Sequence, residues 1–127
     1  AIYKGAVNSD RYLLTYKNAG HNAGAPNPVP REILDSATGE GADHYTDPVW
    51  DNVRMNNVMD HFATAYFTYH LKGDASMLEF LNVYPDGAEA TYSVKDDVPG
   101  EAHNYWPGFA EGSAVGFKLE RLESGQR

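Results

Sequence analysis

The chain contains no cysteine, carries no excess of basic residues and has no long apolar run. Without cysteine there can be no disulfide, no thiolate metal site and no cysteine nucleophile. Lys and Arg number 10 and Asp and Glu number 18, a formal charge of −8, which argues against the positive surface that binds nucleic acid or a membrane. No apolar run approaches the ~20 residues of a membrane span. We therefore expect neither nucleic acid nor a membrane as partner, and these features identify no compartment.

The 127 residues are enough for one domain, which we expect to span residues 1–127. The hydrophobic fraction is 42%, and two Trp, nine Tyr and five Phe supply large side chains for burial. The composition is that of a globular chain with a core, so evidence about function has to come from local patterns.

The segment RYLLTYKN, residues 11–18, is predicted to be a strand. Its nearly continuous apolar run is typical of a strand covered on both faces, as in a parallel sheet. Residues 19–30 follow with two glycines and three prolines, so we expect a loop there. In open α/β sheets, ligands bind at this carboxyl end of the strands.

A long helix is predicted next, with Asp47 as N-cap, Pro48 as first helical residue and Gly73 as C-cap. Between these ends the apolar residues recur at helical spacing, at Met55, Val58, Met59, Phe62, Ala65, Tyr66 and Tyr69. Shorter elements are expected as helical segments within residues 1–8, 31–36 and 75–81 and strands at 91–94 and 116–123. The fold class is α/β or α+β, with one long helix packed on a small sheet and irregular loops.

His21 is the strongest candidate for chemistry. It lies in a loop of small residues directly after the predicted strand, and Gly20 and Gly24 allow close approach of the backbone. An imidazole can accept and return a proton near neutral pH. The alternative is a surface histidine or one that stabilises the loop.

Four segments carry a resemblance that covers nearly all of the chain: RYLLTYKNAGHNAGAPNPVP, HYTDPVWDNVRMNNVMDHFATAYFTYHLKGD, YWPGF and GFKLERL. Together they resemble the C-terminal part of dienelactone hydrolases, which are α/β-hydrolases. The resemblance implies a partial α/β-hydrolase fold with His21 as the histidine of the Ser–Asp–His triad. Asn22 and Trp50 are candidate substrate-binding residues, although Asn22 could instead shape the loop and Trp50 could pack beneath it.

The chain departs from this family in its other catalytic groups. The triad order is Ser, then Asp or Glu, then His, with the serine in a G-x-S-x-G turn. Only Ser9 precedes His21, without flanking glycines, and Ser113 follows it with one glycine a position too close. The family's acid would lie before residue 1, and Asp10 is at the wrong end of the strand. The chain therefore keeps a general base without nucleophile or acid, and we expect it to be inactive alone.

The other histidines do not predict a metal site. His61 and His70 point to opposite faces of the predicted helix, and nothing specifies a third ligand beside Asp43 and His44. His61 is interpreted as a histidine at the edge of the core, and His70 as a solvated residue of the last turn. No dinucleotide motif or other cofactor signature is present, so no cofactor is expected.

Two further features have alternative interpretations. Asn56 and Asn57 lie mid-helix, where asparagine is a poor helix former, so they contact substrate or hold a loop in place. Trp106 within YWPGF stacks on a ligand or fixes an irregular tail to the core.

The apolar helix and the edges of a small sheet need cover. We expect a homo-oligomer, most simply a dimer, or association with a missing N-terminal half. Two functions remain open: a C-terminal fragment of a carboxylic-ester or lactone hydrolase, or a truncated, non-enzymatic oligomeric module for binding or structure, in which His21 is a relic.

Overall fold

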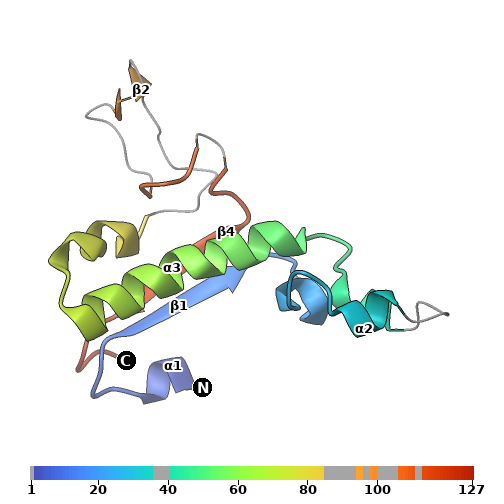
Figure 1. Cartoon of the computed structure of the whole chain (residues 1–127). Helices are drawn as coiled ribbons and strands as arrows, with labels where there is room; N and C mark the ends of the chain where they lie inside the picture. The colour runs from blue at the N-terminus through green and yellow to red at the C-terminus, as the bar shows by residue number, and fades with distance from the viewer. Residues whose placement is uncertain (1, 36–40, 85–93, 96–97, 100–105, 111–112) are drawn as a thin grey trace. The chain divides into compact units, whose positions relative to one another are not determined.

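The computed structural model describes residues 2–35, 41–84, 94–95, 98–99, 106–110 and 113–127. The chain divides into two compact units, residues 1–17 with 75–127 and residues 18–74. The described part combines helices with two small antiparallel sheets of two strands each (Figure 1). The α+β alternative of the predicted fold class is therefore confirmed, and the single domain stays a prediction.

The first unit is built on the pairing of β1 (Arg11–Tyr16) with β4 (Phe117–Leu122), the first and last strands of the chain. Arg11 lies opposite Leu122, and Tyr16 lies opposite Phe117. Both strands were predicted, but the parallel arrangement is wrong for the described residues, because this pair is antiparallel. Leu13 is 37% exposed, so β1 is not covered on both faces. The apolar run predicted a strand and carried no information about its partner.

The remaining elements of this unit are short. Helix α1 (Ile2–Gly5) precedes β1, and η3 (Ala75–Leu81) is a 3-10 helix with Leu81 buried, so both predicted helical segments are confirmed. Strands β2 (Val94–Lys95) and β3 (Val98–Pro99) form the second sheet. The strand predicted at 91–94 is described only at its last residue, and residues 91–93 lie outside the described part.

Trp106 is at the centre of an aromatic cluster in this unit. Its side chain is fully buried, and its Nε1 donates a hydrogen bond of 2.7 Å to the carbonyl oxygen of Asn82. Its ring stacks on Phe117, with 5.5 Å between ring centroids, and meets Tyr84 edge-on. The interpretation that Trp106 fixes the irregular tail to the core is confirmed.

Arg11 is a buried arginine that joins the two ends of this unit. Its Nη1 donates to the carbonyl oxygen of Tyr3 at 2.9 Å. Its Nη2 donates to the carbonyl oxygens of Glu123 at 3.1 Å and Gln126 at 2.7 Å. Three backbone acceptors offset the cost of burying the guanidinium.

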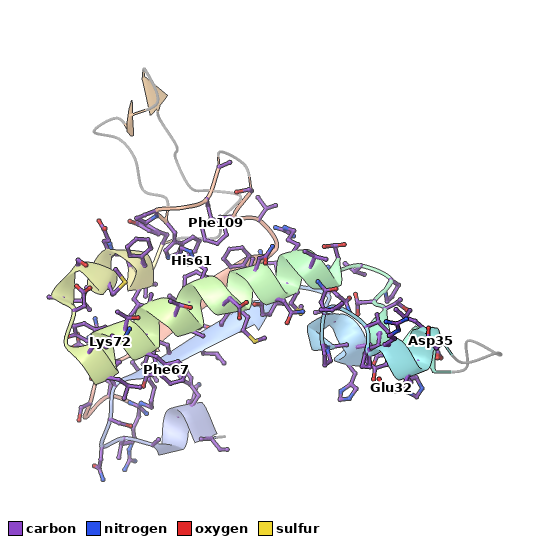
Figure 2. The ribbon with its side chains drawn as sticks, viewed as in Figure 1. Glu32, Asp35, His61, Phe67, Lys72 and Phe109 are labelled. Atoms are coloured by element: carbon purple, nitrogen blue, oxygen red, sulfur yellow. The ribbon has the colours of Figure 1, made fainter. Side chains whose placement is uncertain are left out.

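The second unit contains η1 (His21–Gly24), α2 (Arg31–Leu34), η2 (Ala42–Tyr45) and α3 (Asn52–Lys72). The buried residues of α3 recur at three- and four-residue steps, at Met55, Val58, Phe62 and Ala65. Gly73 ends the helix in the left-handed region, with φ of 72°, as its C-cap role predicted. Phe67, labelled in Figure 2, is 55% exposed on the same helix.

The predicted start of the long helix is wrong by about one turn. The helix begins at Asn52, and its N-cap is Asp51, whose carboxylate accepts a hydrogen bond from the Arg54 amide at 2.7 Å. Asp47 instead accepts from the amides of Val49 and Trp50 within a turn. Two good capping residues lie four positions apart, and the first is used to close this turn.

Candidate functional site

His21 lies at the first position of η1, with its side chain exposed. The predicted loop therefore contains one turn of 3-10 helix, closed by a hydrogen bond from the Ala25 amide to the carbonyl oxygen of Asn22. Gly20, directly before it, has extended backbone. This short helical turn presents the imidazole to solvent on a defined backbone.

An open pocket of about 660 Å³ borders this turn. It is lined by His21, Asn22, Gly24, Ala25, Pro26, His44 and Tyr45. Two histidines and a tyrosine therefore line the same pocket as a segment of small residues. Sequence analysis placed His21 and Asn22 together but did not place His44 with them, because that contact depends on how η2 folds beside η1.

Trp50 lines a different depression of about 350 Å³, formed by residues 45–52. Its side chain is 5% exposed, and the Arg54 guanidinium lies over its ring at 4.7 Å from the centroid. The burial that a packing role for Trp50 requires is therefore present, whereas packing beneath the loop of Asn22 stays a prediction. A role in binding substrate stays a prediction.

Asp47 connects the backbone before His21 to the segment before α3. Its Oδ2 accepts a hydrogen bond from the Gly20 amide at 2.8 Å. Its Oδ1 accepts from the amides of Val49 at 2.9 Å and Trp50 at 2.8 Å. The amides of Trp50 and Val49, and then that of Gly20, lower the pKa of Asp47 because they stabilise the charged carboxylate.

Two asparagines of α3 hold the loop of His21 at positions after the histidine. Asn56 donates through Nδ2 to the carbonyl oxygen of Ala25 at 3.1 Å and to that of Asn52 at 2.8 Å. Asn52 donates to the carbonyl oxygen of Tyr45 at 2.6 Å and to that of Asn22 at 3.3 Å. The loop-holding interpretation of Asn56 is confirmed. Sequence analysis missed Asn52, although its spacing of four residues from Asn56 places both on one side of the helix.

The Asn22 side chain joins the two 3-10 turns. Its Nδ2 donates to the carbonyl oxygen of Asp43 at 3.3 Å, so the loop-shaping role considered for Asn22 is present. In η2, His44 Nε2 lies 4.0 Å from the Asp43 carboxylate, with both side chains exposed. Within the described ranges, no group of three His, Asp or Glu residues is arranged to hold a metal ion.

The two serines considered as nucleophiles have local roles. Ser9 donates to the carbonyl oxygen of Ala6 at 3.3 Å, and Ser113 donates to that of Ala110 at 2.6 Å. Asp10 lies at the start of β1, where it accepts from Arg121 at 3.2 Å. All three contacts stabilise turns or strand ends.

The histidines of α3 are consistent with structural roles. His61, labelled in Figure 2, is partly buried. Its ring meets that of Phe62 edge-on, with 4.9 Å between the ring centroids. Burial lowers the pKa of His61. His70 is exposed in the last turn of α3, and its ring lies beside that of Tyr66, with 4.4 Å between the ring centroids.

Comparison with known family models, curated proteins and solved structures gives no match to this chain. In the part of the chain that the structure describes, no helix has the length and apolar character to cross a membrane. An exposed imidazole on a well-held turn can transfer a proton to or from a group bound in the pocket.

Proposed function

We propose that this chain supplies the general base of a serine hydrolase acting on carboxylic esters or lactones, with His21 as the base. The nucleophile and the orienting acid are supplied from outside these 127 residues. The observation that carries the proposal is the placement of His21, which is exposed on a pocket and lies on a turn whose backbone is hydrogen-bonded at Gly20, Asn22 and Ala25.

In the proposed reaction the imidazole of His21 takes the proton of a serine hydroxyl as its oxygen attacks the ester carbonyl. The ester C–O bond breaks, and the same proton is returned to the departing alkoxide. In the second half of the reaction, His21 takes a proton from water as the water attacks the acyl-serine. It then gives that proton to the serine oxygen as the carboxylic acid is released. This chemistry requires an imidazole that is reachable and fixed in position, and the resemblance described above assigns the same role to His21.

We further propose that the chain is part of an α/β-hydrolase fold, with β1 as the last core strand and α3 as the helix after the histidine loop. The order of elements supports this, because β1 is followed by the His21 turn and then by the longest helix. In the described part, the sheet holding β1 has two strands, with β4 as its neighbour. A core strand has two neighbours, and in this proposal the second belongs to the portion that supplies the serine and the acid.

The isolated chain tests the first half of the proposal. We expect it to hydrolyse p-nitrophenyl acetate no faster than an equal concentration of imidazole, and to stay unlabelled by a fluorophosphonate probe. The reason is that a base without a serine has nothing to activate. Turnover well above that background, if it is lost in His21→Ala, would contradict the proposal that the nucleophile and the acid lie outside this chain.

A chimera tests the second half. The N-terminal portion of a dienelactone hydrolase, carrying its serine and acid, would be joined to residues 1–127. We expect fluorophosphonate labelling and ester hydrolysis, with kcat reduced about 10⁴-fold or more in His21→Gln. His70→Gln is the control, an exposed histidine in the last turn of α3 that does not line this pocket, and it should retain kcat within a few-fold. A folded chimera that resists labelling, or equal losses in both variants, would refute the proposal.

The non-enzymatic alternative is favoured by a separate observation. Several large apolar side chains of α3 are exposed, among them Phe67 at 55% and Leu71 at 78%. Exposed apolar surface of this kind is typical of a face that binds another protein surface. In this alternative the chain is an oligomeric module, most simply a dimer, and His21→Gln changes no function.

A further inference from the structure

We propose that Asp47 is the positioning residue for His21. Its carboxylate fixes the backbone directly before the imidazole by bridging that backbone to the turn before α3. The catalytic consequence rests on the function proposed above, whereas the structural role can be tested in the chain alone.

Three backbone amides converge on this one carboxylate, at 2.8, 2.9 and 2.8 Å. The Gly20 amide reaches Oδ2, whereas the Val49 and Trp50 amides reach Oδ1. Each oxygen is therefore committed to one of the two segments, and Asp47 lies 27 residues after Gly20 in sequence. The ionised carboxylate accepts stronger hydrogen bonds than a neutral acceptor, and the lowered pKa of Asp47 agrees with this arrangement.

Gly20 leaves room for the same contact. A Cβ built on Gly20 would lie 2.6 Å from Oδ2 of Asp47, closer than such atoms approach in real structures. Its backbone is extended, with φ of −80°, so the glycine is explained by this approach and not by backbone strain. Gly20 and Asp47 are thus two halves of one contact, and the residue after Gly20 is the candidate base.

Asp51 provides a matched control four residues along the chain. It is also an aspartate whose carboxylate accepts a backbone amide, but that amide is Arg54, in the first turn of α3. Asp47→Asn and Asp51→Asn therefore remove the same charge from the same region. Only the first changes a group bonded to the backbone before His21.

The first experiment measures amide hydrogen exchange by NMR in the chain of residues 1–127. An asparagine side chain has one acceptor oxygen in place of two, so Asp47→Asn cannot serve both segments. We expect the amide of residue 20 to exchange about tenfold faster in Asp47→Asn and to be unchanged in Asp51→Asn. Gly20→Ala keeps the charge, displaces the carboxylate and should also accelerate exchange at residue 20. Unchanged exchange there in a folded Asp47→Asn variant would overturn the proposal.

The second experiment uses the hydrolase chimera. Misplacing a catalytic group by about 1 Å can cost on the order of 100-fold in rate, so we expect Asp47→Asn to lower kcat at least tenfold with KM unchanged. Asp51→Asn should keep both constants within about twofold. Faster exchange without a loss of kcat would overturn the positioning role and leave the proposed function standing. A parent chimera without activity would refute the proposed function, and the exchange result alone would then decide the structural role of Asp47.

Discussion

Replacing Asn56 by aspartate reverses the hydrogen-bonding character of the side chain with almost no change in its shape. In the protein, Asn56 Nδ2 donates to two carbonyl oxygens, Ala25 at 3.1 Å and Asn52 at 2.8 Å. Aspartate at neutral pH has only acceptors. The substitution Asn56→Asp therefore places a carboxylate oxygen against two carbonyl oxygens, at the point where α3 holds the loop of His21.

The magnitude follows from the two bonds lost. A neutral intramolecular hydrogen bond contributes about 0.5–1.5 kcal/mol net, so their loss alone amounts to about 2 kcal/mol at neutral pH. The position is partly exposed, and rotation of the carboxylate toward water limits any additional repulsion. Protonation of the introduced carboxylate restores one donor, so the defect should shrink as the pH falls toward about 4.

Urea unfolding followed by circular dichroism measures this effect. With a slope of about 2 kcal/mol per molar urea, a loss of about 2 kcal/mol lowers the midpoint by about 1 M. Asn57→Asp is the matched control, because Asn57 is the next residue of α3, is exposed and gains the same charge. Equal midpoints for the two variants at neutral pH would refute the assignment of Asn56 as a donor to the loop.

Three further outcomes are expected. Trp106→Ala should lower the free energy of unfolding by about 3–5 kcal/mol, and Trp106→Phe by only about 1–2 kcal/mol, because it keeps the stack on Phe117 and loses the hydrogen bond to Asn82. Because burial lowers the pKa of His61 in the folded protein, the unfolded chain binds more protons as the pH falls through 6.5. Stability should therefore decrease over that range and level off below the folded pKa, and His61→Gln should remove this slope in denaturant titrations. Sedimentation equilibrium should show a dimer at micromolar concentration, and a compact monomer would contradict the oligomer prediction.

The elements that depend on local pattern were predictable. The apolar spacing of α3 places Met55, Val58 and Phe62 on its buried face, and Gly73 ends the helix as predicted. Asn56 is unusual for its position because asparagine is a poor helix former, and its hydrogen bond to the carbonyl oxygen of Ala25 supplies the reason for its presence. In each case the residue type and the local geometry lead to the same interpretation.

The features that depend on distant partners were not predictable from the sequence alone. Nothing in β1 indicates that its neighbour is β4, with Arg11 opposite Leu122. Asp47 satisfies every local rule for an N-cap, and its actual use depends on an amide 27 residues earlier. His44 reaches the His21 pocket only because the two 3-10 turns fold beside each other.

The guanidinium of Arg11 gives one side chain two long-range connections. It donates to Tyr3, which precedes β1, and to Glu123 and Gln126, which follow β4, so the segments on both sides of the strand pair are held through the same residue. Loss of this one side chain would therefore release both segments together, and their local unfolding would be coupled.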